Sequence, residues 1–383
     1  MNPPHSIAFY IDSLKLGGAE RVLLQWAQWC QEAGWRVVVV TRRGPASDAY
    51  PLPMGVERWV EPADGWLMRF LGWWGFPARI LRLRSLMKGG PFQVVVGVTT
   101  LPAVKVLLAS RGLSQACVVS ERNYPPAKLP SLLWRGLRRL AYPWAELHVV
   151  QTRATGDWLR RHCGAHQQLL LPNPVVWPLA AHGPRLEPSD WLPLTAPVLL
   201  AAGTKAFQKG FDRLVDSFAL LGEAWPELRL VILGLSSTPY HGLDQQGWLR
   251  QRLSDPALQS RFLMPGVAGN IGDWYARATL FALPSRFEGF PNVLLEAMAA
   301  GCACVAADCA TGPADLIHPG ENGLLLPANA PASLWAERLS ELLAQPAERQ
   351  RLGMTAMAVR QTFDAATLRR RFLESLDLLK PHG

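Results

Sequence analysis

At 383 residues, with 49% hydrophobic and 18% charged side chains, the chain has a globular composition and is too long for a single ordinary hydrophobic core. No apolar run approaches the ~18 residues that a membrane-spanning helix requires, which excludes a transmembrane protein. The net charge of +9 is uneven, because residues 1–175 hold 21 Lys and Arg against 10 Asp and Glu, and this predicts an anionic partner for the first half alone.

The chain opens with "MNPPHSIAFYIDS", which lacks a basic segment and loses its apolar character at Asp12. This pattern predicts a first buried strand and not a signal peptide. The six cysteines are scattered, so reduced thiols in a cytoplasmic protein are favoured over a disulfide framework. The stretch "CACVAADC" (302–309) lacks zinc-ligand spacing, and we expect no metal site.

Short β-branched runs alternate with helical patterns through the first half of the chain. One predicted helix, 19–34, ends in a glycine stop signal. Runs that are apolar throughout, with helices between them, are typical of a parallel sheet covered on both faces. The predicted strands are 6–11, 36–41, 94–98, 116–120, 146–151 and 168–172.

A proline-rich segment, 176–197, loses this periodicity and is predicted to be a linker. The alternation then restarts, with a helix near 209–223 and three helical segments from about 331 to 380. The further strands are 198–203, 228–234, 261–264, 279–284, 303–308 and 323–327. The sequence therefore predicts an α/β protein of two doubly wound, Rossmann-like domains, 1–175 and 198–383, facing across a cleft, with ligands at the carboxyl ends of the strands.

Two glycines, Gly17 and Gly18, follow the first strand and open the first helix in "LKLGGAERV" (14–22). Glycine admits backbone conformations closed to other residues and lets a ligand approach main-chain amides at a helix N-terminus. The spacing is not GxGxxG, so a dinucleotide fingerprint is absent. A tight strand–helix turn without a ligand is the alternative.

The second domain opens with "AAGTKAFQKGFDRL" (201–214), in the same position after its first strand. Lys205 and Lys209 flank this strand–helix junction, where a phosphate would meet both ammonium charge and the helix dipole. Solvated lysines on a loop are the alternative.

The stretch "RFEGFPNVLLEAMAAG" (286–301) places Glu288 in a loop and Glu296 in the following helix. Pro291 suits the first helical position, so the amides of Asn292, Val293 and Leu294 would be free for a ligand. An acid/base pair would need the two carboxylates about 5–10 Å apart around one bond. We favour another use for Glu296, because an unpaired charge among apolar neighbours is costly and a carboxylate suits the hydroxyls of a vicinal diol.

Together these stretches carry a family resemblance. "GGAERV", "LPNPV" (171–175), "QKGFDRL" and the two glutamates of "PSRFEGFPNVLLE" (284–296) resemble the retaining glycosyltransferases of family 4 over essentially the whole chain. The resemblance implies the two-domain GT-B fold. It also implies a nucleotide-sugar substrate held by the second domain, an acceptor held by the first, and neither a metal nor a cofactor.

The resemblance also implies roles for individual residues. Glu296 would bind the ribose hydroxyls, Glu288 the transferred sugar, and Lys209 the diphosphate. Lysines and helix dipoles would stabilise the departing diphosphate. The remaining donor-binding residues would be Gly18, Gly203, Thr204, Gly289, Phe290, Pro291, Asn292 and Val293.

Two positions depart from the family pattern. Thr204 stands where the family has an arginine, and Lys205 could supply that charge one position later, although lysine does not reproduce bidentate binding of phosphate. In "SERNYPP" (120–126), Arg122 stands at or near the place of a family histidine and joins Lys205 as a catalytic candidate. Gly17, Glu121, Arg122 and Asn123 are then candidates for acceptor binding, with a salt-bridged loop as the alternative.

Two basic, aromatic stretches of the first half account for the charge asymmetry. They are "WLMRFLGWWGFPARILRLRSLMK" (66–88) and "LPSLLWRGLRRLAYPW" (129–144). Such segments predict helices that lie in an anionic membrane interface. No nucleic-acid-binding signature accompanies them. An ordinary core face backed by a solvated basic face is the alternative.

The sequence thus predicts a metal-independent, retaining hexosyltransferase that moves a hexose or N-acetylhexosamine from a nucleotide-sugar, UDP-sugar in preference, to a lipid-linked or polysaccharide acceptor. Its place would be cell-surface glycan synthesis, such as lipopolysaccharide, on the inner face of the cell membrane. Residues 1–175 would bind acceptor and membrane and 198–383 the nucleotide-sugar, with the last helix crossing back. A nucleotide-sugar epimerase or hydrolase, against which the two glutamates argue, and a non-catalytic sugar-binding relative are the alternatives.

Overall fold

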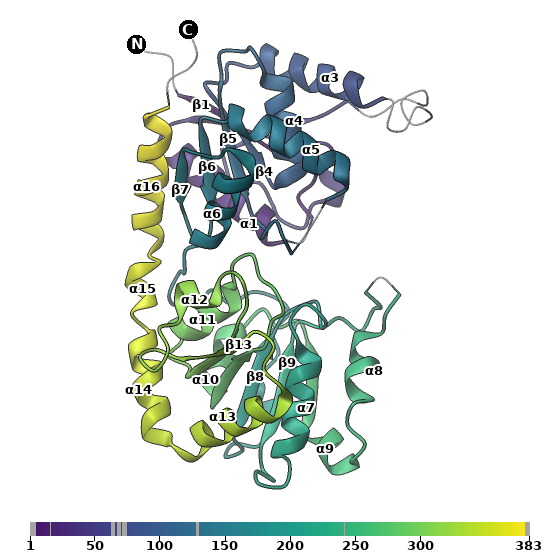
Figure 1. The fold of residues 1–383 in the computed structure, drawn as a ribbon, viewed down its shortest axis with the longest axis vertical. Helices are drawn as coiled ribbons and strands as arrows, with labels where there is room; N and C mark the ends of the chain where they lie inside the picture. The colour runs from purple at the N-terminus through teal and green to yellow at the C-terminus, as the bar shows by residue number, and fades with distance from the viewer. Residues whose placement is uncertain are drawn as a thin grey trace. The chain divides into compact units, whose positions relative to one another are not determined.

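The computed structural model of the protein describes residues 5–15, 17–62, 66, 70, 75–127, 130–240 and 242–379 (Figure 1). The chain forms two compact units. Unit 1 runs to Asn173 and takes in the last helix from Ala366, and unit 2 spans Pro174–Ala365.

Unit 1 is built on a seven-stranded parallel sheet in the order β3-β2-β1-β4-β5-β6-β7. The central strands are buried on both faces, as their continuous apolar runs predict. The strands are β1 (Ser6–Ile11), β2 (Arg36–Thr41), β3 (Glu57–Val60), β4 (Val94–Val98), β5 (Ala116–Glu121), β6 (Leu147–Val150) and β7 (Gln168–Leu170).

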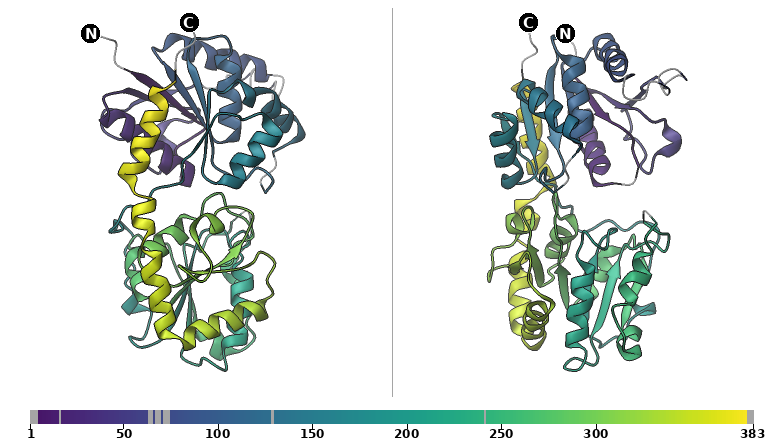
Figure 2. Two further views of the ribbon diagram at one scale, coloured as in Figure 1. Left: turned by 60° about the vertical axis from the view of Figure 1, so that its left-hand side comes forward. Right: turned by 45° about the vertical axis from the view of Figure 1, so that its right-hand side comes forward.

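Helices cover both faces of this sheet (Figure 2). They are α1 (Gly18–Glu32), α3 (Phe76–Gly89), α4 (Thr100–Ser110), α5 (Leu132–Ala141), α6 (Arg153–Cys163) and α16 (Ala365–Asp377), with short 3-10 turns at Pro45–Ser47 and Tyr142–Trp144. The glycine stop predicted after α1 is confirmed, because Gly34 has φ +85°, a left-handed conformation that ends a helix without a Cβ clash.

The last helix, α16, packs on α1 of unit 1. The ring of Phe372 stacks on Trp26 at a centroid distance of 4.6 Å, and Arg369 forms an ion pair with Glu32 at 2.8 Å. Phe372 and Trp26 are both fully buried, so this contact removes large apolar surfaces from water.

Unit 2 repeats the design with a six-stranded parallel sheet in the order β10-β9-β8-β11-β12-β13. Its strands are β8 (Val198–Ala202), β9 (Arg229–Leu233), β10 (Phe262–Gly266), β11 (Leu280–Leu283), β12 (Cys304–Asp308) and β13 (Leu324–Pro327). Its helices are α7 (Phe211–Leu221), α8 (Gln245–Arg250), α9 (Pro256–Ser260), α10 (Ile271–Arg277), α11 (Asn292–Ala299), α12 (Pro313–Leu316), α13 (Ala332–Ala344), α14 (Pro346–Ala356) and α15 (Val359–Thr362), with a 3-10 turn at Pro188–Asp190.

The sheet of unit 2 has a separate apolar core on each face. Phe211, Phe218 and Trp335 belong to one core, in which α7 packs on α13. Trp274 and Leu294 belong to the other, under α10 and α11. The prediction of two doubly wound α/β units is therefore confirmed.

The proline-rich segment after Val175 packs onto unit 2. The side chain of Asn270 accepts a hydrogen bond from the Leu186 amide at 2.8 Å and donates to the Leu186 carbonyl at 3.1 Å. The indole of Trp274 donates to the same carbonyl at 2.8 Å. Side chains at the start of α10 thus satisfy both backbone hydrogen-bonding groups of Leu186.

Two predictions of secondary structure differ from the structure: strand β3 was not predicted, and the number of helices after residue 331 was wrong. Strand β3, "ERWV", is short and lies at the sheet edge with half-exposed side chains, so it lacks the continuous apolar run used to find the others. The three helical segments predicted from about 331 onward were wrong, because the structure has four, α13 to α16. Pro346 starts α14 directly after α13, which divides one helical pattern into two helices.

Removing the Phe372 ring should destabilise unit 1 because the buried contact with Trp26 is lost. We expect Phe372→Ala to lower the free energy of unfolding by about 3–5 kcal/mol. The matched control is Leu378→Ala, just beyond the same helix, since Leu378 is exposed. Denaturant unfolding measures both variants, and equal stabilities would contradict the account.

Acid should weaken unit 1 through His148 of β6. Its side chain is buried, and burial lowers its pKa to about 4. As pH falls below about 6.5, His148 of the unfolded chain takes up a proton, whereas His148 of the folded chain stays neutral until about pH 4. The free energy of unfolding therefore falls on acidification. We expect this group to cost about 2–3 kcal/mol between pH 7 and pH 4.5.

Denaturant unfolding of wild type and His148→Gln at both pH values measures the contribution of His148 to this loss of stability. The variant lacks the titrating group and should lose less stability on acidification than wild type. Parallel losses in the two proteins would show that His148 does not carry the effect.

Candidate functional site

The candidate site in unit 2 is formed by two loops that follow neighbouring parallel strands. One loop, 203–210, leaves β8, and the other, 284–291, leaves β11, which pairs with β8. Because parallel strands end at the same edge of a sheet, both loops lie at the carboxyl edge, where doubly wound folds bind ligands.

Lys209 and Glu288 meet across these loops. The Lys209 ammonium donates to Glu288 Oε1 at 2.7 Å, and both side chains are largely buried. Ser285 Oγ donates to the same oxygen at 2.6 Å. No side chain of the described residues donates to Oε2, so the side-chain hydrogen bonds of Glu288 within that part of the chain all go to one oxygen.

Three glycines let these loops approach each other. A Cβ on Gly210, which has φ +66°, would lie 2.0 Å from the carbonyl oxygen of Pro284. A Cβ on Gly312, with φ +98°, would lie 2.5 Å from Pro291 Cδ. At Gly203 a Cβ would press into the stem of Lys209, so this glycine makes room for the lysine. Gly210 and Gly312 are thus positions that favour glycine, because each has a positive φ and a Cβ there would collide with a neighbouring proline.

The start of α11 differs from prediction. Pro291 is the N-cap and Asn292 the first helical residue, one position later than expected. The amide of Asn292 donates to the Phe290 carbonyl at 3.1 Å and that of Leu294 to the Pro291 carbonyl at 3.0 Å. The prediction that both amides are free was wrong, because a tight turn before the helix uses them.

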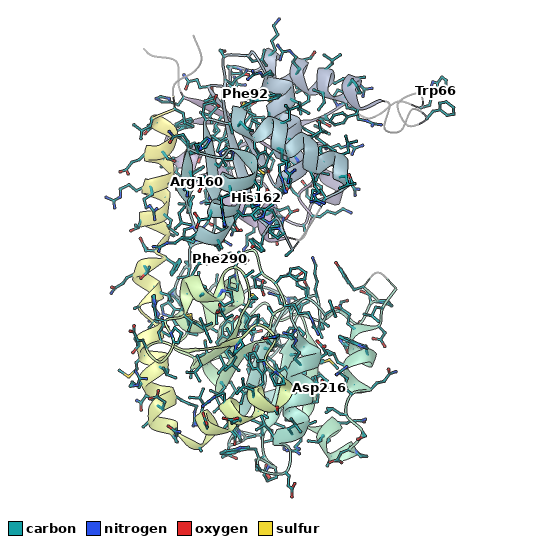
Figure 3. All side chains as sticks on the ribbon, in the orientation of Figure 1. Trp66, Phe92, Arg160, His162, Asp216 and Phe290 are labelled. Atoms are coloured by element: carbon teal, nitrogen blue, oxygen red, sulfur yellow. The ribbon has the colours of Figure 1, made fainter. Side chains whose placement is uncertain are left out.

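Phe290 and Gly289 complete this loop. The ring of Phe290, labelled in Figure 3, packs against Phe363 at a centroid distance of 6.1 Å and is buried. Its side chain therefore belongs to the core of unit 2, and only its backbone lies in the loop. Thr311 Oγ1 donates to the Glu288 carbonyl at 2.5 Å, which ties the loop down from the segment after β12.

Glu296 lies over one turn into α11 and is half-buried. The hydroxyl of buried Tyr275 donates to Glu296 Oε2 at 3.4 Å and to the Val293 carbonyl at 3.1 Å. Burial raises the pKa of Tyr275 well above its ordinary value, and the negative charge of Glu296 raises it further. The Tyr275 hydroxyl therefore keeps the proton that it donates. Glu296 thus has a hydrogen-bond partner and is partly exposed to solvent. The expectation of a charge surrounded only by apolar side chains was wrong.

Thr204 and Lys205, where the family has an arginine, make side-chain and backbone contacts outside the Lys209–Glu288 pair. Thr204 is exposed, and its carbonyl accepts from Gln245 Nε2 at 3.1 Å. Lys205 Nζ lies 5.9 Å from the centre of the Tyr240 ring, a cation–π contact, while its carbonyl accepts from the Lys209 amide at 2.9 Å. Lys205 thus shares the loop of Lys209 without sharing its contact with Glu288.

In unit 1, Gly17 and Gly18 stand at the start of α1, as predicted. The reason given for the two glycines was wrong, because Gly17 has extended φ (−174°) and Gly18 is helical, conformations open to other residues. Space distinguishes them. A Cβ on Gly17 would lie 2.2 Å from Glu20 Oε2, whereas none of the described atoms lies within 4 Å of one on Gly18. Gly18 leaves the helix start accessible.

Glu121 ends β5 in a fully buried position. Its carboxylate accepts from Thr100 Oγ1 at 3.0 and 3.1 Å and from Tyr142 at 2.9 Å, and the Asn123 amide also donates to it. Burial raises its pKa above the ordinary value. Glu121 therefore holds the loop together from inside.

Arg122 is also buried, against the ring of Trp26 at 5.3 Å, and its Nη2 donates to Asn173 Oδ1. Burial lowers its pKa to about 9. Its Nε and Nη1 have no hydrogen-bond partner within the described part of the chain. Both atoms are fully buried, so Arg122 carries two unused donors inside the protein.

The basic aromatic stretches form α3 and α5, which Phe76 and Trp134 join edge to face at 5.5 Å. Large exposed apolar side chains accompany them, namely Trp66, Phe70, Leu81, Leu132, Leu133 and Leu140. Arg69, Trp73 and Trp74 of this prediction lie outside the described residues. Of the basic residues, Arg84 turns inward to the carbonyls of Ala109 and Arg111.

A cavity of about 650 Å³ lies at the edge of the unit 1 sheet where β5 and β6 begin, opposite the carboxyl edge that carries Glu121. Gln115 and Glu146, which line it, precede β5 and β6, whereas Glu121 ends β5. It contains none of the predicted site residues. No group of three or more His, Cys, Asp or Glu side chains that could hold a metal lies among the described residues. Within that part of the chain, no helix is long and apolar enough to cross a bilayer.

Sequence reasoning missed the residues that support the site. Ser285 and Thr311 hold Glu288, Tyr275 holds Glu296, and Arg286 and Asp212 link the two loops. Ser285, Arg286 and Asp212 stand within three residues of Glu288 or Lys209, and this proximity was the available signal.

Comparison with curated proteins gives partial matches. The chain is 32% identical to "Exopolysaccharide phosphotransferase SCO2592" of Streptomyces coelicolor over 251 residues, 65% of this chain and 25% of that protein. It is 35% identical to "Lipopolysaccharide core biosynthesis mannosyltransferase LpsB" of Rhizobium meliloti over 33% of this chain and 36% of that protein. The chain thus spans about a quarter to a third of the length of these relatives.

Among solved structures, Anabaena Alr3699/HepE in complex with UDP and glucose is similar over 98% of this chain and 100% of that one, with a TM-score of 0.77 and 20% sequence identity. The likeness shows the GT-B fold. Residues 16–176 match the family described as "Glycosyltransferase Family 4" and residues 196–345 that described as "Glycosyl transferases group 1". With both halves matched and the fold in agreement, the chain belongs to the family 4 glycosyltransferases.

Proposed function

We propose that the protein is a retaining glycosyltransferase that moves a hexose or N-acetylhexosamine from a nucleotide-sugar to a lipid-linked or polysaccharide acceptor. The observation that carries this proposal is the buried Lys209–Glu288 pair beside the start of α11. A UDP-sugar donor is supported by the Anabaena protein, which was solved with UDP and glucose. A surface-glycan acceptor is supported by the two relatives described above, an exopolysaccharide phosphotransferase and a lipopolysaccharide core mannosyltransferase by name.

Donor binding follows from the charges of unit 2. As the bond between the anomeric carbon and the diphosphate breaks, negative charge grows on the leaving oxygen. The Lys209 ammonium and the α11 dipole stabilise that charge, with Lys205 in the same loop, so the step draws its positive charge from the protein and not from a metal. We also assign Gly203, Thr204 and Gly18 to donor binding, as the family resemblance implies.

Glu288 and Glu296 divide the rest of the donor between them. Oε2 of Glu288 accepts from hydroxyls of the transferred sugar, while Lys209 and Ser285 fix Oε1. Glu296, fixed by Tyr275, accepts from the ribose hydroxyls. Gly289, Phe290, Pro291, Asn292 and Val293 contribute backbone or polar contacts from the loop and the first turn of α11.

We assign acceptor binding to Gly17, Glu121, Arg122 and Asn123 of unit 1. The place of Arg122 directly after β5, at the carboxyl edge of the sheet, supports this assignment and its catalytic candidacy. Glu121 acts through the shape of the loop, because its carboxylate already serves Thr100 and Tyr142.

We also propose that unit 1 attaches to the inner face of the cell membrane and not to nucleic acid. Helix α5 supports this, because it carries exposed Leu132, Leu133 and Leu140 together with Arg135 and exposed Arg139. Apolar side chains flanked by guanidinium groups match an anionic lipid interface.

Nucleotide release from a panel of UDP- and GDP-sugars, with and without lipid-linked acceptors, tests the reaction. We expect release by wild type, retention of the donor's anomeric configuration, and a fall of about 100-fold or more in Lys209→Ala and Glu288→Gln, because each removes charge stabilisation or sugar positioning. Glu341→Gln, on the surface of the same unit, is the control and should keep full activity.

Other outcomes of this assay would refute the site assignment, the transfer reaction or the retaining mechanism. Unchanged turnover in both variants would refute the site assignment. Release without transfer to any acceptor would indicate a hydrolase, and donor binding without release would indicate a non-catalytic sugar-binding relative. An inverted product would refute the retaining mechanism.

Flotation with vesicles of anionic phospholipid tests membrane attachment. We expect binding at low salt that weakens at high salt, because screening reduces the attraction of Arg135 and Arg139. The double variant Arg135→Glu, Arg139→Glu should lose binding, whereas Arg153→Glu, Arg161→Glu on α6 carries the same charge change and should keep it. Equal binding by both variants, or no binding by wild type, would refute this part of the proposal.

A further inference from the structure

A second ion pair joins the two site loops beside Lys209 and Glu288. Arg286 binds Asp212 with both ends of its guanidinium, Nη1 to Oδ1 at 2.7 Å and Nη2 to Oδ2 at 2.6 Å. Both side chains are mostly buried. Parallel hydrogen bonds of this kind fix orientation as well as distance.

The positions of the two partners set what this pair controls. Arg286 lies two residues before Glu288, and Asp212 lies three residues after Lys209 in the first turn of α7. The pair therefore spans the same two segments as the Lys209–Glu288 pair, a few residues away on each.

Further bonds from Arg286 and its neighbour close the loops together. Arg286 Nη1 donates to the Phe207 carbonyl at 2.7 Å, and its guanidinium lies 4.1 Å from the centre of the Phe207 ring. The Arg286 amide donates to the Gln208 carbonyl at 2.9 Å, and Gln208 Nε2 donates to the Phe287 carbonyl at 3.2 Å. Arg286 alone thus reaches Phe207 and Gln208 of the opposite loop and Asp212 in the first turn of α7.

The charges of this pair are satisfied by each other. Burial raises the Asp212 pKa, but the hydrogen bonds and charge of Arg286 outweigh it, and the pKa lies below its ordinary value. Asp212 therefore stays ionised at neutral pH, and neither partner has charge left over for a ligand.

We propose that Asp212 and Arg286 are a positioning pair that holds Lys209 and Glu288 in their reactive arrangement. The inference rests on the proposed function, because it assigns the pair a part in the same reaction. When a phosphate draws the Lys209 ammonium, the direct bond to Glu288 weakens, and the Asp212–Arg286 bonds keep the loops at their spacing. Small losses of alignment at reacting groups lower rates steeply.

Helix α7 supplies a matched control. Arg252 binds Asp216 in the same two-pronged way, at 2.7 and 2.5 Å, four residues further along the helix (Asp216 is labelled in Figure 3). This pair ties α7 to the segment after α8 and touches neither site loop. Removing it costs an ion pair on the same helix without the proposed positioning effect.

The first experiment compares kinetics of the full chain. We expect Arg286→Ala and Asp212→Asn to lower kcat at least 10-fold, Arg286→Lys to lower it by a smaller factor, and Arg252→Ala and Asp216→Asn to stay within twofold of wild type. In a Lys209→Ala background, Arg286→Ala should lower kcat by a smaller factor than it does in wild type, because one of the two groups that it positions is gone. A similar kcat loss in the Arg252 variant, or full additivity with Lys209→Ala, would overturn the proposal.

The second experiment does not depend on activity. Hydrogen exchange should accelerate across 205–210 and 284–290 in Arg286→Ala and Asp212→Asn and stay unchanged there in Arg252→Ala. Unchanged exchange in all variants would overturn the inference. If wild type releases nucleotide from no donor, the proposed function fails while hydrogen exchange still decides whether the pair holds the loops.

Discussion

The contact between Lys209 and Glu288 at the edge of the unit 2 sheet is the interaction on which the proposed chemistry depends. Two opposite charges are buried together at 2.7 Å, and such a pair persists only where further hydrogen bonds complete it. Ser285 supplies one to the carboxylate and Thr311 one to the backbone behind it. The pair thereby keeps a cation and a carboxylate ready at the start of a helix, where an anionic ligand is favoured.

The fold provides this contact by placing β8 beside β11. Parallel neighbours end at one edge, so segments 79 residues apart in sequence leave the sheet together. Gly210 and Gly312 then allow the loops to close, because any side chain at those positions would collide with Pro284 or Pro291. The same logic organises unit 1, where the ends of β4 and β5 bring Thr100 to Glu121. In both units, burial of apolar strands fixes where polar loop residues meet.

Much of the fold was predictable because its strands are buried on both faces and so are continuously apolar. Strand β3 escaped because an edge strand needs no such run. Lys209, Glu288 and Glu296 could be proposed as site residues from their motifs, but the side chains that contact them could not be predicted. The bond from Ser285, the turn that uses the Asn292 and Leu294 amides, and the contact of Lys205 with Tyr240 depend on side-chain directions and loop closure, which local sequence does not determine.

A crystal structure of the full chain with UDP tests the central claim most directly, because it locates the diphosphate without requiring the right sugar or acceptor. The account predicts a diphosphate oxygen within about 3 Å of Lys209 Nζ, near the first turn of α11, and ribose hydroxyls on Glu296. UDP bound elsewhere, with the Lys209–Glu288 pair undisturbed and Glu296 without a ribose contact, would contradict it.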